Sequence, residues 1–410
     1  MSHAGGYSAA SHLRWQECLP WVMGVAAFFL LPEYLSLGAR ILVFILFALS
    51  LDLILGYAGI ITLGHSAFFG VGAYVAGILG AKLGIGDPLL QLAAAAVAAG
   101  ECMASLGSDT GGSIRQPAAF CGVVGLKPTY GRVSRHGVIA YASSFDQVGP
   151  FARSLDDLAL ITEVISGVDA FDTTCSERAV PAMAPVPAER PFTFGYYKEV
   201  LDNPALDAEI RQYFFDRVDQ LTSAGHRVEA LDFPYLDALV PIYYILTTAE
   251  ASSNLARYDG VHIGHRSEQA TDLESLYKKS RSEGFGEEVQ RRILLGTFVL
   301  SAGYFDAFYG KAQKARRVVR DATLEALTRV DALIGPTTPH TAFPLGQEYT
   351  DPTVLYLEDI FTVQAPIAGI PAVSIPAGPH SNGLPFGMQI MAGPFDEPKM
   401  FQAAHILDRL

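Results

Sequence analysis

The residues best suited to chemistry lie in one glycine-rich loop at positions 106–117, LGSDTGGSIRQP. Gly111 and Gly112 directly precede Ser113, and glycine tolerates the positive φ angles of a sharp turn. Successive backbone N–H groups in such a turn can converge into an anion-binding hollow. A hydroxyl beside that hollow suits acyl transfer, because the serine can attack a carbonyl while the N–H groups stabilise the oxyanion. Taken alone, most Gly-Gly-Ser sequences are ordinary turns.

The sequence around this loop is far more specific than its Gly-Gly-Ser core. Residues 105–153 closely resemble the amidase signature family, and within it the A subunits of the aspartyl/glutamyl-tRNA amidotransferases. The resemblance continues over about residues 95–410. It rests on the stretches GGSIRQP at 111–117, GLKPTYGRVS at 125–134, DQVGPFAR at 146–153, AEASSNL at 249–255, RRILLGT at 291–297 and GMQ at 387–389.

The resemblance implies that Ser113 is the acylating nucleophile. The backbone around Thr110, Gly111 and Gly112 would then supply the oxyanion hole. The family activates its nucleophile through a second Ser, which relays the proton to a buried Lys, and both come from the chain before the loop. In this chain no Ser occurs between residues 67 and 104. We therefore expect a chain with the nucleophile but without its base, and so with doubtful activity.

Three charged residues near these motifs are assigned no catalytic role. Lys82 is the only Lys before the loop, but it lies outside the resemblance. Lys127 matches a Lys of the family motif that is not the catalytic one, so packing or pairing near the loop is expected. Glu358 is expected to be a solvated neighbour of the substrate site.

The resemblance also implies a pocket for the α-amino and α-carboxylate groups of glutamine. Matching motifs place Asp359, Arg292 and Tyr243 there. An Arg fork suits a carboxylate and an Asp suits an ammonium group. Arg291 and Tyr244 remain alternatives to their neighbours, and each of these side chains could instead belong to a structural pair.

The charge of the chain is unevenly distributed. The 410 residues hold 29 basic and 42 acidic residues, a net charge of −13, and almost all of this imbalance lies after residue 100. An acidic domain without a Lys/Arg stripe binds phosphate backbones poorly, so contact with tRNA is expected through a partner. The four cysteines form no paired motif, so no zinc or redox site is expected.

The first 92 residues read as a different kind of protein. Residues 19–37 are apolar except for Glu33, and residues 41–81 carry Asp52 as their single formal charge. About 20 apolar residues cross a bilayer, so two or three transmembrane helices are expected. A pair of buried helices is the alternative. Residues 15–90 resemble the start of a branched-chain amino-acid ABC transporter permease, on the run LSLDLILGYAGIITLGHSAFFG at 49–70.

Two unrelated sequences thus meet in the alanine run at 92–100, which suggests a chimera. We expect permease-like helices at 1–92 and an amidase-signature domain at 93–410 that is truncated at both ends. The expected fold is α/β, a mixed central sheet covered by helices but lacking its N-terminal part.

The sequence after residue 150 alternates between strand and helix patterns. Ser154 reads as a helix N-cap. Strands are expected at 192–196, 227–231, 330–334, 372–375 and 388–391, and helices at 207–224, 242–258 and 295–329.

We interpret the chain as the glutamine-hydrolysing subunit of the tRNA-dependent amidotransferase. It would release ammonia through a Ser acyl-enzyme, and the complex would convert Glu-tRNA(Gln) or Asp-tRNA(Asn) to the amidated form. The expected partners are the B and C subunits, glutamine, and aminoacyl-tRNA reached through a partner. No cofactor or metal is expected in this chain, since ATP and Mg would serve the partner subunit. The alternatives are a stand-alone amidase, a permease fragment and an inactive chimera. The amidase domain is expected in the cytoplasm, with membrane association if residues 19–90 belong to the protein.

Overall fold

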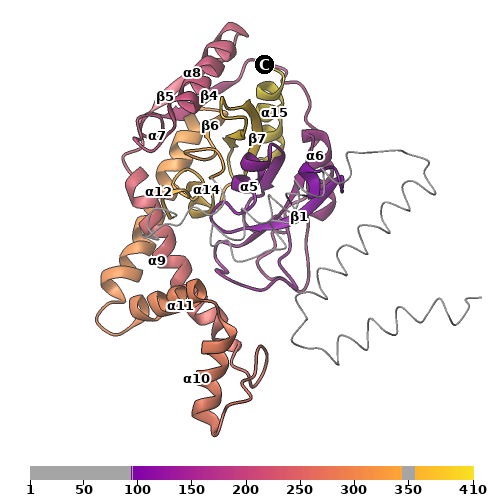
Figure 1. Cartoon of the computed structure of the whole chain (residues 1–410). Helices are drawn as coiled ribbons and strands as arrows, with labels where there is room; N and C mark the ends of the chain where they lie inside the picture. The colour runs from indigo at the N-terminus through magenta and orange to yellow at the C-terminus, as the bar shows by residue number, and fades with distance from the viewer. Residues whose placement is uncertain (1–93, 95, 344–355) are drawn as a thin grey trace, which may run out of the picture. The chain divides into compact units, whose positions relative to one another are not determined.

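The computed structural model describes residues 94, 96–343 and 356–410. Its strands are β1 (Ala104–Asp109), β2 (Val124–Lys127), β3 (Gln147–Ala152), β4 (Thr193–Tyr197), β5 (Arg227–Leu231), β6 (Ala332–Pro336), β7 (Ala372–Pro379) and β8 (Pro385–Met391). Among the described residues they form one sheet in the order β1-β3-β2-β7-β8-β6-β4-β5 (Figure 1). β4 pairs in parallel with β5 and β6, whereas the other pairs are antiparallel. The expected mixed α/β sheet is confirmed.

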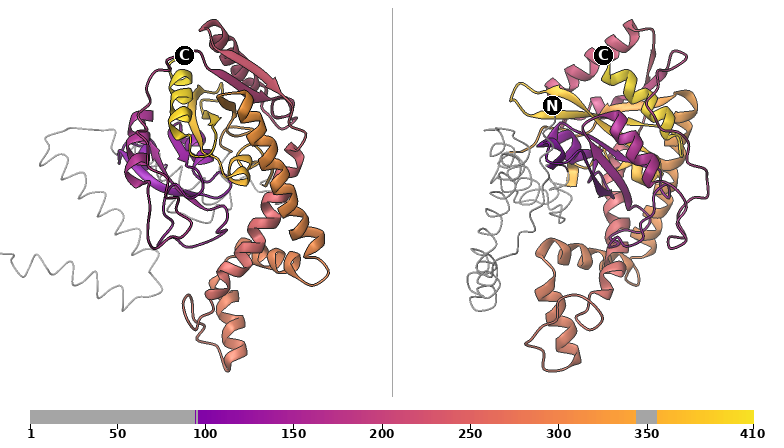
Figure 2. Two further views of the ribbon diagram at one scale, coloured as in Figure 1. Left: turned by 180° about the vertical axis from the view of Figure 1, so that it is seen from behind. Right: turned by 90° about the vertical axis from the view of Figure 1, so that its right-hand side faces the viewer.

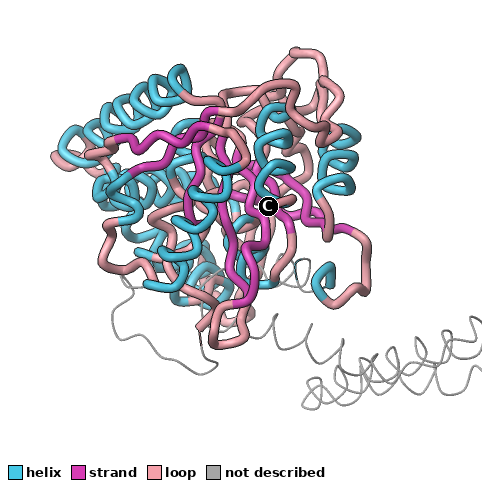
Figure 3. The backbone as a smooth tube through the Cα atoms, turned by 90° about the horizontal axis from the view of Figure 1, so that it is seen from above, coloured by secondary structure: helices cyan, strands magenta, loops and turns pink. Residues whose placement is uncertain are grey.

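Helices flank the sheet on both sides (Figure 3). They are α5 (Arg115–Cys121), α6 (Leu155–Ile165), α7 (Lys198–Leu201), α8 (Ala208–Ser223), α9 (Leu236–Asn254), α10 (Leu273–Gly284), α11 (Glu287–Leu300), α12 (Lys311–Arg329), α14 (Gln364–Ala368) and α15 (Glu397–Asp408), with a 3-10 turn η3 (Leu255–Arg257) and a π-helical turn η4 (Asp306–Gly310). α5 packs on β7 and β8, which places the start of α5 over the middle of the sheet. α10 and α11 extend away from the sheet (Figure 2).

Local sequence signals set several of these boundaries. Ser154 is the N-cap of α6 and its hydroxyl accepts a hydrogen bond from the Asp157 N–H at 3.1 Å, as expected. Asp207 caps α8 in the same way, accepting from the N–H groups of Glu209 and Ile210. Gly225 follows that helix with a φ of +91°, a conformation that favours glycine and ends the helix.

Two expectations about regular structure were wrong. The run at 106–117 is a loop only in its middle, because residues 106–109 belong to β1 and residues 115–117 to α5. The expected single helix at 295–329 is broken into α11, η4 and α12. α11 ends at the extended residue Ser301, and Gly303 has a φ of +88°. The rings of Phe298, Tyr304 and Phe308 pack across this break.

The expected membrane segments at 19–37 and 41–81 lie outside the described residues. In the described part of the chain, no helix combines the length and apolarity that crossing a membrane would need. The expected domain boundary at residues 92–93 also lies outside that part, so it stays a prediction.

Candidate active site

The Ser113 loop is held at its base by one carboxylate. Asp109 ends β1, and its Oδ2 accepts hydrogen bonds from the backbone N–H groups of Ile114 at 3.3 Å and Arg115 at 3.4 Å. The same carboxylate forms an ion pair of 2.9 Å with the Arg115 guanidinium, and neither side chain is exposed to solvent. Residues 110–113 therefore form a short loop whose two ends are tied together.

Arg115 also connects this loop to the C-terminal part of the chain. Its Nη1 donates to the Thr362 carbonyl at 2.8 Å and to Gln389 Oε1 at 2.5 Å. Gln389, on β8, in turn donates through Nε2 to the Phe361 carbonyl at 2.9 Å. The segment around residues 361–362 is thereby fixed against the Ser113 loop.

Two side chains cover the glycines of the loop closely. Tyr243 lies so near Gly111 that a Cβ there would be 2.5 Å from the Tyr243 hydroxyl. A Cβ on Gly112 would be 2.4 Å from Thr362 Oγ1, and the Gly112 φ is +145°. The sequence-based prediction of a sharp glycine turn before Ser113 is confirmed at Gly112.

Ser113 itself is partly exposed. Within the described residues its hydroxyl has no hydrogen-bond partner. Thr110 differs, because its hydroxyl donates to Asp146 Oδ1 at 2.6 Å. The Thr110 side chain is thus occupied, which leaves its backbone for the predicted oxyanion role.

Asp359 lies beside the start of α5. Its Oδ1 accepts from Gln116 Nε2 at 2.8 Å and its Oδ2 from the Tyr244 hydroxyl at 2.8 Å. Burial raises the pKa of Asp359 to about 6, against the hydrogen bonds and the Arg292 charge, which lower it. Gln116 comes three residues after Ser113, so Asp359 and the nucleophile loop lie on the same side of the sheet.

The Arg292 side chain lies near Tyr244, the residue that binds Asp359. Its Nε donates to Glu288 at 2.9 Å and its Nη1 to the Tyr141 hydroxyl at 3.0 Å. The guanidinium carbon lies 5.7 Å from the ring centre of Tyr244, which binds Asp359. Arg291 is half exposed and pairs with the other carboxylate oxygen of Glu288, but within the described residues no hydrogen bond or ion pair joins it to Tyr141 or Tyr244. The geometry therefore favours Arg292 over Arg291.

The choice between the two tyrosines is less simple than the sequence implied. Tyr243, the predicted residue, contacts Gly111 of the Ser113 loop, but the hydroxyl that binds Asp359 belongs to Tyr244. The structure thus places Tyr243 against the Ser113 loop, and it links Asp359 to the start of α5 through Gln116 and to the neighbourhood of Arg292 through Tyr244. The sequence analysis did not predict Gln116 or Tyr141, whereas Tyr244 was its alternative to Tyr243. Gln116 lay within the quoted motif, and its contact with Asp359 spans 243 residues of sequence.

Glu358 is not the solvated neighbour that we expected. Its side chain is 12% exposed, and Oε1 lies 3.2 Å from His340 Nδ1. This hydrogen bond raises the pKa of His340. Lys127, in contrast, fits the expected packing role: it is fully buried in β2, and its Nζ donates to the Pro128 carbonyl at 2.7 Å. Burial lowers the pKa of Lys127 to about 7.

Gly112→Ala is expected to lower the free energy of unfolding by about 2–4 kcal/mol, because a left-handed backbone and a clash with Thr362 add together. Urea denaturation measures the loss. Gly137→Ala is the matched control, since Gly137 has a φ of +83° but no atom within 4 Å of the added Cβ. Equal losses in the two variants would show that the contact with Thr362 is not tight.

Comparison with known proteins gives two family matches. The amidase family matches residues 93–401. The family described as branched-chain amino acid transport system / permease component matches residues 34–110. The first agrees with the amidase resemblance, and the second supports the suggestion of a chimera.

Individual relatives agree with the first match. The A subunit of glutamyl-tRNA(Gln) amidotransferase from Koribacter versatilis is 51% identical over 320 residues, which are 77% of this chain and 66% of the relative. The A subunit of the same enzyme from Chlorobium luteolum is 50% identical, with 77% and 66% covered. This chain therefore spans just under two thirds of the length of these relatives.

Solved structures show the same fold. The A subunit of glutamyl-tRNA(Gln) amidotransferase from Thermotoga maritima superposes with a TM-score of 0.62 at 41% identity, covering 76% of this chain and 63% of that one. The peptide amidase of Stenotrophomonas maltophilia gives a TM-score of 0.61 at 29% identity, covering 78% and 64%.

Proposed function

The chain belongs to the amidase family, and on that basis we propose that it is the glutamine-hydrolysing subunit of a tRNA-dependent amidotransferase. The observation that carries the proposal is the contact of Asp359 with both Gln116, which follows the Ser113 loop, and Tyr244, which lies beside Arg292. A free amino acid has an ammonium and a carboxylate close together, and this cluster offers one partner for each.

In the proposed reaction, Ser113 Oγ attacks the side-chain amide carbon of glutamine. Backbone N–H groups at residues 110–112 stabilise the oxyanion, and ammonia leaves as the C–N bond breaks. Water then hydrolyses the glutamyl ester and releases glutamate. The Ser113 proton must pass to a base, which the resemblance places before the loop, and from that base to the leaving nitrogen, so that ammonia is released.

The α-ammonium and α-carboxylate groups of glutamine would contact Asp359 and Arg292. The Asp359 carboxylate attracts the ammonium. Arg292 uses Nε and Nη1 for Glu288 and Tyr141, and among the described residues its Nη2 has no partner. That remaining donor suits the α-carboxylate.

The partners belong to this proposal as well. The released ammonia would be used by the B and C subunits, with ATP and Mg at the partner, to amidate Glu or Asp on tRNA. A stand-alone amidase is the second candidate, because the similarity to the peptide amidase covers the same part of the chain. Membrane association through residues 19–90 rests on the permease match alone.

Selective binding of L-glutamine by the full chain tests the proposal. Calorimetry should show binding of L-glutamine and much weaker binding of butyramide, which has the amide but neither α group. A stand-alone amidase for simple amides would bind both equally, and that result would overturn the assignment.

Glutamine binding is expected to weaken as the pH falls through about 6, where Asp359 takes up a proton. Below this value the carboxyl group loses the charge that attracts the ammonium. The dissociation constant should therefore rise about tenfold for each further pH unit. Calorimetry over a pH series measures the change.

Two variants assign this pH dependence. Asp359→Asn should bind weakly at every pH, whereas the neighbouring Glu358→Gln should keep the dependence while removing the His340 pair. A flat profile in the unmodified chain would exclude Asp359 as the ammonium partner.

A further inference from the structure

Asp146 lies beside the Ser113 loop, at the start of the strand β3 that pairs with β1. It directly precedes β3, and the antiparallel pair Asp109–Gln147 places Thr110 opposite Asp146. The side chain is 6% exposed. Its position is therefore fixed by the sheet register, and it has little contact with water.

The two carboxylate oxygens of Asp146 serve two different segments. Oδ1 accepts from the Thr110 hydroxyl at 2.6 Å. Oδ2 accepts from the backbone N–H groups of Tyr141 at 3.0 Å and Ala142 at 2.9 Å. A carboxylate is suited to this bridge because both its oxygens accept.

Each segment carries one half of the proposed site. Thr110 is the first residue of the loop that presents Ser113. Tyr141 receives the hydrogen bond from Arg292 Nη1 at 3.0 Å through its hydroxyl. Asp146 thus stands between the nucleophile loop and the Arg that would bind the α-carboxylate.

We propose that Asp146 is a positioning residue that sets the distance between the Ser113 loop and Arg292 by holding Thr110 and the backbone at Tyr141 and Ala142 at the same time. The consequence for glutamine rests on the proposed function. A substrate that touches both halves needs this distance fixed, since small displacements of reacting groups are costly.

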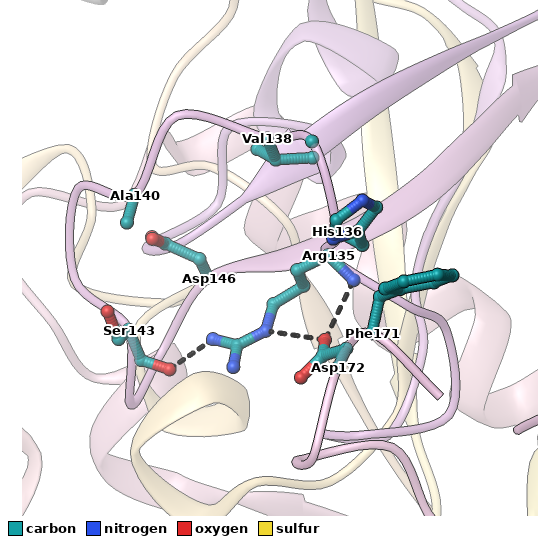
Figure 4. A pocket seen from close by; sticks show the side chains of 9 residues that line it. Arg135, His136, Val138, Ala140, Ser143, Asp146, Phe171 and Asp172 are labelled. Atoms are coloured by element: carbon teal, nitrogen blue, oxygen red, sulfur yellow. Dashed lines mark hydrogen bonds and ion pairs between the residues drawn. The ribbon is translucent and has the colours of Figure 1, made fainter. Parts of the chain in front are cut away.

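The surroundings of Asp146 support a bridging role over an ion-pairing one. Asp146 borders a cavity of about 260 Å³ together with Arg135, Ser143 and Asp172 (Figure 4). Arg135 forms its ion pair with Asp172 at 3.5 Å and donates to the Ser143 carbonyl and the Thr174 hydroxyl, so that in the described part of the chain none of its hydrogen bonds or ion pairs is to Asp146. Burial raises the pKa of Asp146 to about 6, which leaves it ionised at neutral pH.

Hydrogen exchange on the full chain tests the bridge directly. Asp146→Asn carries a single acceptor oxygen, and it should raise exchange about tenfold in two peptides together, residues 107–116 and 139–145. Asp172→Asn is the matched control, because this carboxylate lines the same cavity but contacts neither Thr110 nor Tyr141. It should leave both peptides unchanged.

A binding cycle separates positioning from general destabilisation. Asp146→Asn should weaken glutamine binding about tenfold in the unmodified chain, but have little further effect once Tyr141→Phe has removed the contact with Arg292. Additive losses would mean that Asp146 acts by another route.

Failure of the proposed function and failure of the bridge give different results. If the unmodified chain binds no glutamine, the proposed function fails, and the exchange experiment still decides the role of Asp146. Exchange that stays unchanged in both peptides, or rises in only one of them, would overturn the bridge. A uniform rise throughout the protein in Asp146→Asn would overturn it as well, because the role would then be structural only.

Discussion

Glutamine hydrolysis is expected to rise by on the order of 10⁴ when residues 1–92 are replaced by a family-like segment that carries the relay Ser and the catalytic Lys. The Ser113 loop is intact, but a serine hydroxyl is a weak nucleophile without a base. Residues 67–104 contain no Ser, and the one Lys before the loop, Lys82, lies outside the amidase resemblance. The measurement is ammonia release at saturating glutamine, with the partner subunits present.

Ser113→Ala in the restored protein is the control, and it should abolish the gain. The same substitution in the unmodified chain should change little, because little activity remains to be lost. A near-normal rate in the unmodified chain that disappears on Ser113→Ala would reveal a base that we have not identified.

Arg115→Leu is expected to lower the free energy of unfolding by about 3–5 kcal/mol, the typical loss when one partner of a buried ion pair is removed. The substitution leaves the Asp109 carboxylate without its counter-ion at a position with no solvent exposure. It also removes the donor to the Thr362 carbonyl and to Gln389. The shift in the midpoint of urea denaturation measures the effect.

The exposed ion pair of Arg317 with Asp321 provides the control for this experiment. Its side chains are 75% and 57% exposed, so Arg317→Leu should cost less than about 1 kcal/mol. Adding Asp109→Asn to Arg115→Leu should restore part of the loss, because the buried charge is then gone. Equal effects of the two Arg substitutions would contradict the assignment of a buried pair.

The strands that the sequence predicted correctly are those whose own residue types indicate a strand. β4 and β5 are short runs with apolar and aromatic residues, and their predicted bounds agree with the structure to within one residue. β1 has the sequence ASLGSD, which has a low strand propensity, and it is a strand because it pairs with β3 along its whole length. Tertiary pairing of this kind cannot be seen in a single sequence.

The contacts within the candidate site show the same limit of prediction from a single sequence. The motif predicts Ser113 as the nucleophile, and the resemblance predicts Asp359 and Arg292 as substrate-binding residues. The contacts that hold these residues together could not be predicted in this way, because the Gln116–Asp359 contact joins residues 243 positions apart. The wrong expectation for Glu358 has a similar cause. Its partner His340 lies 18 residues away, and no local pattern predicts that the two side chains meet.

The order of the strands has a consequence for the time at which the site forms during synthesis. β7 and β8 come last in the chain, yet they lie between the β1-β3-β2 group and the β6-β4-β5 group. A ribosome therefore makes two half-sheets that have no common edge until residues 372–391 emerge. Arg115 obtains its partner Gln389 at that same moment. The nascent chain thus contains Ser113 for some 260 residues before β7 and β8 complete the sheet beside it. A chain interrupted before β7 would therefore present Ser113 without an organised site.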